Sequence, residues 1–272
     1  MVASRVVTKA ATTTSVGTKK QLFILRHGQA THNPRAEAAR AQGCSHEEFL
    51  EWMRRDDSLD SELTELGMSQ ARAVLRDRLQ HHPILWSRSE NTKRTNLELV
   101  VSSPLSRALQ TADLAVPFEE PKRICREHFR EINGWLQNAK RRSLTYLAQQ
   151  FPNWDFTHII TEHDESWTPE LETQSDCSER GYQGLSWILR RPESVICLVC
   201  HGGILRFAMN QHDAIRVVDG RENGSDRDVK GRFGNCELRR YSIEWDEEVN
   251  GEEETTTNNN MRRTIILTEL DC

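Results

Sequence analysis

The sequence predicts an α/β fold, because short apolar segments alternate along the chain with segments of helical periodicity. Three apolar segments carry this prediction, at residues 22–25, 97–101 and 194–200. All three stop abruptly at small, polar or turn-forming residues, and the first contains no alternating polar position. Such segments are typical of strands buried on both faces of a sheet. Since a helical pattern follows each one, we expect parallel strands flanked by helices.

The composition is that of a soluble globular protein. The chain has 272 residues, of which 28% are charged and 36% hydrophobic, and its formal net charge is -5. This length suits one large domain with insertions better than two domains. Because the chain has no overall basicity, we expect no nucleic-acid partner and a small substrate.

The distribution of apolar residues and cysteines indicates the compartment. No segment reaches the roughly 20 apolar residues that span a bilayer, and the N-terminus lacks the apolar core of a secretory signal. We therefore expect no membrane partner and a cytoplasmic location. Seven cysteines without framework spacing predict reduced thiols. Cys197 and Cys200 lie three residues apart on one predicted strand, so they should face opposite sides as core residues.

The chain is expected to consist of one main domain between two tails. Residues 1–20 are rich in Thr, Ser, Ala and Val and predict a disordered tail, with an organelle transit peptide as the alternative. The main domain should cover residues 21–245 and carry helical and loop insertions at about 34–59 and 123–170. Residues 246–272 form an acidic and then Asn/Thr-rich tail that ends in a possible last strand.

The first predicted helices follow the first strand. Residues 34–55 have a helical composition and should lie over the strand tips. Thr64 is expected to cap a helix that continues to Leu79. The core face of this helix is predicted to consist of Leu66, Ala73, Val74 and Leu79.

The second strand repeats the transition from strand to helix. Ser103 is predicted to be the N-cap of the following helix, and Pro104 occupies the first helical position that proline tolerates. Arg107 then falls in the first turn, near the carboxyl edge of the sheet. A solvated helix arginine is the alternative interpretation of this residue.

The second half of the chain is predicted in the same way. The expected elements are a strand over 123–131, helices over 144–150, 179–191 and 204–210, a loop over 219–233, an edge strand over 236–245 and a last strand over 262–270. Pro192 should end the helix at 179–191, and Leu185, Ile188 and Leu189 should face inward. The sheet is expected to end near the edge strand, with the last strand pairing with it.

Two histidines stand at the ends of predicted strands. Arg26, His27 and Gly28 end the first apolar segment, and His201 and Gly202 follow the third. In open α/β sheets, functional sites lie at the carboxyl ends of the strands. Glycines there permit close approach of a ligand, in particular an anion, to the main chain. One Arg-His-Gly tripeptide is weak evidence, but a second histidine followed by glycines at another strand end points to a site for phosphate.

These motifs together resemble the histidine phosphatase superfamily, in its phosphoglycerate mutase-like branch. The resemblance rests on RHG at residues 26–28, on Asn33 downstream of it, on LTELGMSQA, on SSPLSRALQTA with Arg107, and on VCHGG with His201. It covers roughly residues 22–210. The resemblance implies a three-layer α/β/α fold with a mainly parallel central sheet.

The resemblance also implies a two-step reaction. His27 would attack phosphorus as a neutral imidazole and form a phosphohistidine. Arg26 and Arg107 would help to keep it neutral and, with His201, would bind the equatorial phosphoryl oxygens. No metal or other cofactor is expected.

The family takes the proton for the leaving group from a carboxylic acid after the second-arginine helix. Glu131 is preferred for this role, because Gly134 follows it at the family's E-x-x-G spacing. Glu127 also resembles the relatives, but choosing it loses the glycine and requires a four-residue insertion. On one strand the two carboxylates would have equal parity, so both could face the pocket.

The expected substrate-binding residues are Gly28, Asn33, Gly202, Arg141 and Arg142. The last two belong with Lys140 to a run of three cations. Such a run either binds phosphate or forms a solvated face.

Three functions remain open from the sequence. The leading hypothesis is a metal-independent phosphatase acting on a small phosphate ester. The departures from the family's pattern around Glu131 and the long insertion favour it over a mutase. A cofactor-dependent phosphoglycerate mutase is the alternative within the same family. A catalytically silent module that binds phospho-ligands or proteins is the alternative of another class, although the chain retains every expected catalytic residue type.

Overall fold

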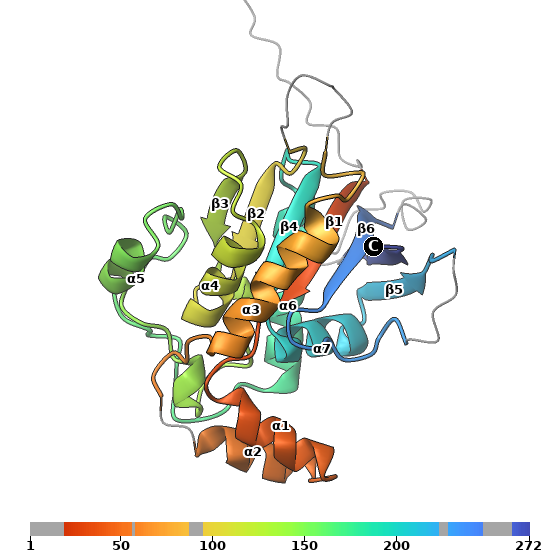
Figure 1. Ribbon diagram of the computed structural model, residues 1–272. Coiled ribbons are helices and arrows are strands. Elements are labelled where there is room, and N and C mark those ends of the chain that lie inside the picture. Colours follow the sequence, from red (N-terminus) through yellow and green to blue (C-terminus); the bar gives the residue numbers. More distant parts are fainter. Residues whose placement is uncertain (1–18, 56–57, 87–94, 223–227, 247–262) are drawn as a thin grey trace, which may run out of the picture.

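The computed structural model shows one mixed sheet between two layers of helices (Figure 1). It describes residues 19–55, 58–86, 95–222, 228–246 and 263–272. The predicted N-terminal tail therefore lies outside the described residues except at its last two positions, and so does most of the acidic segment after Asp246.

The sheet has seven strands within the described residues, in the order β3-β2-β4-β1-β6-β7-β5. Their bounds are Lys20–Arg26 for β1, Leu99–Ser102 for β2, Lys122–Cys125 for β3, Val195–Cys200 for β4, Ile215–Asp219 for β5, Leu238–Trp245 for β6 and Ile265–Leu270 for β7. Strands β1 to β4 run parallel, whereas β6 is antiparallel to both β1 and β7. The sheet is thus mainly parallel, as predicted.

Helices cover both faces of the sheet, which confirms the three-layer arrangement. Their bounds are Asn33–Ala41 for α1, His46–Arg54 for α2, Glu65–Val74 for α3, Ser106–Ala115 for α4, Leu144–Gln150 for α5, Gln174–Leu189 for α6 and Gly202–Gln211 for α7. In Figure 1, α3 and α4 cross the near face of the sheet, and α6 lies behind it. No helix in the described part of the chain is long and apolar enough to span a membrane.

The alternation of β1 divides the hydrophobic core in two. Leu22 and Ile24 belong to the cluster that includes residues of α6 and α7, whereas Phe23 and Leu25 belong to the cluster that includes residues of α3 and α4. Cys197 and Cys200 on β4 divide in the same way, and both thiols are buried and free. The interpretation of these cysteines as core residues on opposite faces is confirmed.

The predicted helix at 34–55 is two helices, α1 and α2, which lie beyond the carboxyl ends of the strands (Figure 1). Gly43 separates them with a φ of 85°, a conformation that continues no helix. Ser45 then caps α2, accepting a hydrogen bond from the Glu48 amide while the Glu48 carboxylate accepts one from the Ser45 amide. A reciprocal cap of this kind restarts the helix in a new direction.

Thr64 caps α3 as predicted, and Val74 and Leu79 of the predicted core face are buried, but the α-helix ends at Val74 and the rest of that face is wrong. Leu66 is 54% exposed, whereas Gly67, Ala71 and Val74 are buried. Gly67 faces inward, where the main chain at Gln29 packs closely against it. A Cβ at Gly67 would lie 2.0 Å from the Gln29 carbonyl oxygen. The loop after β1 therefore rests on a glycine of α3.

The predicted start of α4 at Ser103 and Pro104 is also wrong. The helix begins at Ser106, and its N-cap Leu105 has no side chain that can accept a hydrogen bond. Instead, the buried carboxylate of Asp60 accepts hydrogen bonds from the Ser106 amide at 2.9 Å and from its hydroxyl at 2.7 Å. A distant residue thus satisfies the helix N-terminus, which a local capping pattern cannot predict.

The second half of the sheet differs most from expectation. The strand β6 is not an edge strand, because it pairs with β1 on one side and β7 on the other. The pairing of the last strand with β6 is confirmed, but the sheet continues to β5, which the sequence pattern did not reveal. Both faces of β6 are largely buried, and this weakens the alternation that an edge strand shows.

Two further predicted helices are confirmed, although α6 differs from its predicted bounds at both ends and ends at Leu189. Helix α5 has the predicted bounds, and Leu185, Ile188 and Leu189 of α6 are buried. Helix α6 begins at Gln174 rather than Glu179, because Thr173 accepts a hydrogen bond from the Asp176 amide and caps an additional turn.

Candidate active site

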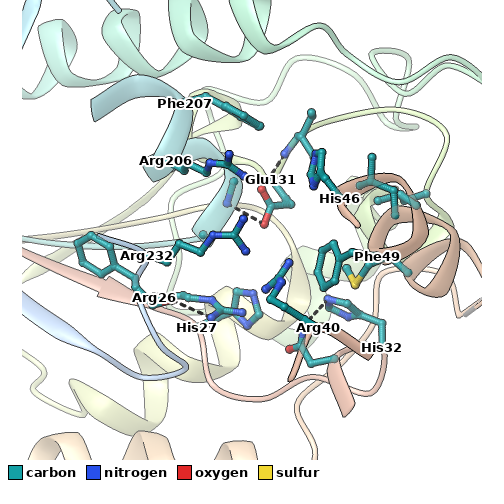
Figure 2. Close-up of a pocket in the computed structure, with 18 residues that line it drawn as sticks. Arg26, His27, His32, Arg40, His46, Phe49, Glu131, Arg206, Phe207 and Arg232 are labelled. Atoms are coloured by element: carbon teal, nitrogen blue, oxygen red, sulfur yellow. Dashed lines mark hydrogen bonds between the residues drawn. The ribbon is translucent and has the colours of Figure 1, made fainter. Parts of the chain in front are cut away.

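The parallel pairing of β1 with β4 brings the two strand-end histidines together. Arg26 pairs with Cys200 in the sheet register, so His27 and His201 leave the sheet side by side. Their ring centroids lie 4.9 Å apart, and both residues are buried. His27 lines a cavity that opens between the strand ends and helices α1 and α2 (Figure 2).

The contacts of His27 define its tautomer and its charge. Its Nδ1 lies 2.6 Å from the Gly28 carbonyl oxygen, and because a carbonyl only accepts hydrogen bonds, Nδ1 carries the proton. Burial lowers the pKa of His27 well below its ordinary value, and the charges of Arg107 and Arg26 lower it further. At neutral pH the ring is therefore uncharged, with a lone pair on Nε2.

Arg107 presents unused donors inside the protein. Its side chain is fully buried, and its Nη1 donates to the Asn138 carbonyl oxygen at 2.6 Å. Its Nε and Nη2 have no hydrogen-bond partner among the described residues. Burial lowers the pKa of Arg107 to about 10, so the guanidinium stays protonated at neutral pH. Buried cationic donors without partners are costly unless an anion binds them.

Arg26 and His201 complete the inner part of the site. Arg26 donates to the Phe233 carbonyl oxygen at 2.8 Å and contacts Glu37 at 3.5 Å, while its Nε has no partner among the described residues. His201 shares a hydrogen bond of 2.8 Å with the Ser103 hydroxyl through Nε2, and its Nδ1 is likewise unpartnered. Burial, followed by the charge of Arg107, lowers the pKa of His201 well below its ordinary value.

The Glu131 carboxylate lines the same cavity. One carboxylate oxygen accepts a hydrogen bond from the Ile132 amide at 2.9 Å, and the other accepts one from the Gly203 amide at 3.2 Å. A Cβ at Gly203 would lie 2.0 Å from the first oxygen. The glycine at position 203 therefore makes room for a carboxylate of the protein, and not for an anionic ligand as we expected of the glycine pair.

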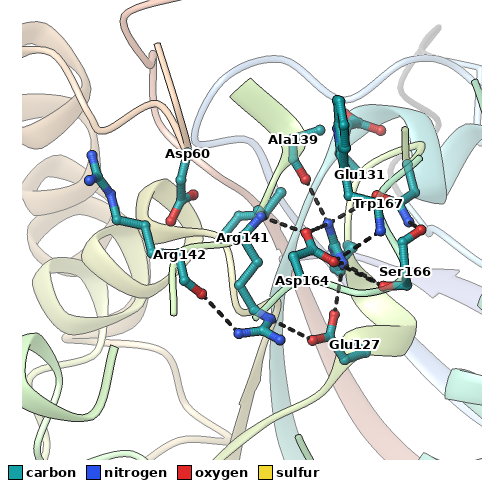
Figure 3. Close-up of polar contacts among 12 residues, drawn as sticks. Asp60, Glu127, Glu131, Ala139, Arg141, Arg142, Asp164, Ser166 and Trp167 are labelled. Carbon is teal, nitrogen blue, oxygen red and sulfur yellow. Dashed lines mark hydrogen bonds and ion pairs between the residues drawn. The ribbon is translucent and has the colours of Figure 1, made fainter. Parts of the chain in front are cut away.

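Glu127 lies elsewhere, and the parity expectation for the two glutamates is wrong. Strand β3 ends at Cys125, and residues 127–129 form a 3₁₀ turn, so no common strand carries both carboxylates. Glu127 pairs with Arg141 at 2.8 Å and with Arg130 at 3.2 Å (Figure 3). It does not line the cavity that contains His27.

Arg141 and Arg142 are not brought to this cavity and line a separate one together with Lys140, so their expected role in substrate binding stays a prediction. Arg141 is buried and donates to Glu127 (Figure 3). It also donates to the carbonyl oxygens of Thr161 and His163. Arg142 donates to the Leu59 carbonyl oxygen at 3.2 Å. The Arg141 guanidinium thus holds the insertion together, and neither arginine lies among the residues that line the cavity of His27.

The remaining expected binding residues have different positions. Asn33 and Gly202 line the cavity. Gly28 does not serve ligand approach, because its amide donates to the Thr111 hydroxyl at 3.0 Å and a Cβ would lie 2.6 Å from the Gly67 carbonyl oxygen. The space left by its missing side chain is filled by α3 and not by a ligand.

His32 is a site residue that the sequence analysis missed. It is buried, and its ring centroid lies 6.3 Å from that of His27. The Ala30 main-chain amide donates a hydrogen bond to Oδ1 of Asn33 and so fixes the orientation of that side chain. The side-chain nitrogen of Asn33 then donates to His32 Nε2 at 3.0 Å. The proton of His32 is therefore on Nδ1, which has no partner among the described residues. The position of His32 directly before Asn33 was the available signal.

The outer lining of the cavity was also not predicted from the sequence. Three arginines and several apolar side chains form it: Arg40, Arg206, Arg232, Phe49, Leu50, Met53, Ile132, Leu136, Phe207 and Phe233 (Figure 2). Arg40 follows Asn33 by seven residues on α1, a spacing that places both on one helix face. Arg232 lies in an irregular segment, where no periodicity indicates it.

The strand ends of this α/β/α sandwich thus gather two neutral histidines and two arginines that have unpartnered donors among the described residues. The family model of the histidine phosphatase superfamily (branch 1) matches residues 22–226, and the chain belongs to this superfamily. Among the described residues, no group of three His, Cys, Asp or Glu side chains is placed to hold a metal ion.

Particular relatives carry mutase-like names. The chain is 29% identical to phosphoglycerate mutase-like protein 1 of Arabidopsis thaliana over 259 residues, which cover 82% of this chain and 81% of that protein. It is 30% identical to phosphomutase-like protein 3 of Candida albicans over 197 residues, covering 69% of this chain and 58% of that one. A solved mycobacterial glucosyl-3-phosphoglycerate phosphatase is 19% identical, with a TM-score of 0.45 and coverage of 82% of this chain and 93% of that chain.

Proposed function

We propose that this protein is a metal-independent phosphatase that hydrolyses a small phosphate ester through a phosphohistidine at His27. The observation that carries the proposal is the environment of His27. A neutral imidazole, with its lone pair on Nε2, lies beside arginines whose buried donors lack partners. A phosphoryl group supplies the anionic oxygens that these donors need.

In the first step, the lone pair of His27 Nε2 attacks phosphorus, and the bond between phosphorus and the ester oxygen breaks. Arg26 and Arg107 stabilise the negative charge on the equatorial oxygens, the main contribution to catalysis in phosphoryl transfer. The Glu131 carboxyl group donates a proton to the departing oxygen, so an alcohol leaves. Its position in the cavity suits this role, whereas the contacts of Glu127 do not.

In the second step, water attacks phosphorus and the bond to Nε2 breaks. The Glu131 carboxylate accepts the proton of the attacking water. Inorganic phosphate leaves, and both His27 and Glu131 return to their starting protonation states.

Substitution of the nucleophile tests the proposal. His27→Ala should reduce hydrolysis of p-nitrophenyl phosphate by at least about 10³-fold, because covalent catalysis is lost. An acid-labile phosphoenzyme should form on the wild-type protein and not on the variant. His81→Ala, which changes an exposed histidine, is the matched control and should keep wild-type activity. Full activity of His27→Ala would overturn the proposal.

The names of the Arabidopsis and Candida relatives favour a second candidate, a phosphoglycerate mutase. A mutase must retain the phosphohistidine long enough to return the phosphoryl group to its substrate. Isomerisation of 3-phosphoglycerate, measured with and without a bisphosphoglycerate primer, separates the two functions. We expect no primer-dependent isomerisation and slow release of phosphate instead.

A further inference from the structure

The segment that carries Glu131 has no regular secondary structure of its own. Strand β3 ends at Cys125, a 3₁₀ turn covers residues 127–129, and residues 130–136 form neither a helix nor a strand. Because no ladder of hydrogen bonds fixes the main chain of such a segment, other groups must satisfy its carbonyl oxygens and amides. The position of the Glu131 carboxylate therefore depends on side chains that hold this segment from outside.

Arg180 of α6 binds three carbonyl oxygens of this segment. Its Nη1 donates to the carbonyl oxygens of His128 and Arg130, each at 3.0 Å, and its Nη2 donates to that of Glu131 at 3.1 Å. A guanidinium group is planar and carries its donors in a fixed fork, so one side chain can hold several carbonyl oxygens relative to one another. Arg180 thereby holds the main chain at Glu131 itself and at the residue before it.

Glu172 holds the same segment on the other side of Glu131. Its two carboxylate oxygens accept hydrogen bonds from Nε and Nη2 of Arg180 at 2.8 and 2.6 Å, and the two side chains are only 14% and 19% exposed. The second of these oxygens also accepts a hydrogen bond from the Asn133 amide at 2.8 Å, and the Glu172 amide donates to the Asn133 carbonyl oxygen at 2.8 Å. One ion pair thus binds the main chain both before and after the position of the carboxylate.

Two helices in mutual contact hold Glu131 at its main chain and at its carboxylate. Helix α6 carries Arg180, whereas α7 carries Gly203, whose amide donates to the carboxylate at 3.2 Å. The helices pack closely, since a Cβ at Gly181, the residue after Arg180, would lie 2.5 Å from the Cβ of Ala208 on α7. The geometry of the carboxylate is therefore set by two elements that support each other, and proton transfer requires such a fixed geometry.

Arg180 and Glu172 are not among the residues that line the cavity containing His27. They therefore make no contact with a substrate bound there, and any effect on the reaction must pass through the segment that carries Glu131. A misplacement of about 1 Å, caused by a change remote from the reacting atoms, can reduce a rate by about 10²-fold.

We propose that Arg180, with Glu172 as its counter-ion, is a positioning residue that holds the Glu131 carboxylate within reach of the departing oxygen. The inference rests on the proposed phosphatase function, in which Glu131 protonates the leaving group. It adds a residue 49 positions away along the chain to the groups on which that step depends.

Two aryl phosphates with different leaving groups test the inference. Phenyl phosphate needs a proton on the departing oxygen, whereas p-nitrophenyl phosphate releases a stabilised anion and depends on the acid far less. The readout is the ratio of kcat/KM for phenyl phosphate to kcat/KM for p-nitrophenyl phosphate. Because the amount of folded protein cancels in this ratio, a merely structural loss does not change it.

In Arg180→Gln the ratio should fall by about 10²-fold, because only phenyl phosphate requires a well-placed acid. Arg180→Lys keeps a cation beside Glu172 but has no planar fork, so its ratio should lie between those of Arg180→Gln and the wild-type protein. Arg190→Gln, which changes an exposed arginine at the end of α6, is the matched control and should keep the wild-type ratio.

The outcomes separate this inference from the proposed function. Hydrolysis of both esters by Arg180→Gln with a wild-type ratio would overturn the positioning role and leave the phosphatase intact. If Arg180→Gln does not fold, Arg180→Lys carries the test, and a wild-type ratio in that variant would overturn the role in the same way.

Hydrogen exchange decides the question if the wild-type protein hydrolyses neither ester, a result that would refute the phosphatase. The Glu131 carboxylate accepts hydrogen bonds from the amides of Ile132 and Gly203. In Arg180→Gln these two amides should exchange at least about tenfold faster, while the amides of β1 keep their wild-type rates. Unchanged exchange at both amides would show that Arg180 does not position the carboxylate.

Discussion

Gly203 controls the position of the Glu131 carboxylate at the level of single atoms. Its amide donates to one carboxylate oxygen at 3.2 Å, and its missing Cβ leaves space for the other. The adjacent Gly202 is less constrained, since a Cβ there would lie 3.4 Å from the nearest atom of Arg26. One glycine of the pair thus positions the proposed acid, and the other borders the cavity.

Gly203→Ala tests this arrangement. The new Cβ would displace the carboxylate, so proton donation to the leaving group should fail. We expect kcat for phenyl phosphate, a poor leaving group, to fall by about 10²-fold, and kcat for p-nitrophenyl phosphate to fall far less. Gly234→Ala is the control, because the nearest atom to its Cβ lies at 3.5 Å. Equal losses on both substrates would contradict a role in protonation.

At the level of elements, α4 depends on a residue remote in sequence. The Asp60 carboxylate accepts two hydrogen bonds from Ser106 at the helix N-terminus, and Arg107 occupies the same turn. Burial raises the pKa of Asp60, and the hydrogen bonds from Ser106 oppose this shift. The segment before α3 therefore holds the helix that positions the second arginine of the site.

Asp60→Ala should lower the free energy of unfolding by about 2–3 kcal/mol, because buried donors at the α4 N-terminus lose their acceptor. KM for an aryl phosphate should rise as well, since the first turn carries Arg107. Urea denaturation and steady-state kinetics measure the two effects. Asp77→Ala removes an exposed carboxylate that pairs with its neighbour Arg76, and no measurable loss of stability is expected. A rise in KM without any loss of stability would contradict the capping role.

At the scale of the whole molecule, folding buries several histidines in the neutral state. The pKa values of His27, His32 and His201 all lie well below the ordinary value, primarily because of burial. Unfolding exposes them to water, where they bind protons below a pKa of about 6.5. The unfolded state then binds more protons than the folded state, so stability should decrease as the pH falls below about 6.5.

Each such histidine contributes a slope of up to about 1.4 kcal/mol per pH unit between its unfolded and its folded pKa. Three histidines therefore predict a decrease of up to about 4 kcal/mol per pH unit below pH 6.5. Urea denaturation from pH 7.5 to pH 5 measures this dependence. His201→Gln removes one titrating group and should reduce the slope by about 1.4 kcal/mol per pH unit. A free energy of unfolding that is constant over this range would show that the site histidines are not buried in neutral form.

The contiguous motifs determined much of the site from the sequence. Arg26, His27, Arg107 and His201 each follow the end of an apolar strand, and parallel strands that end at one edge must bring these residues together. The helix starts were less predictable, because Asp60 caps α4 from a distant segment. The continuation of the sheet to β5 was missed, because β5 pairs with β7, which is remote along the chain.

By itself, the sequence therefore determined the α/β/α class, the strand-end histidines and arginines, and the superfamily, since these depend on local patterns at the ends of buried strands. Only the tertiary structure placed Glu131 at the cavity and Glu127 away from it. It also held Arg141 in a structural network and brought Arg40, Arg206 and Arg232 to one cavity from three different segments. The physical reason is the same in each case. Irregular segments have no periodicity that a sequence can reveal. Whether a charged side chain is neutralised depends on its neighbours in space, which are remote along the chain.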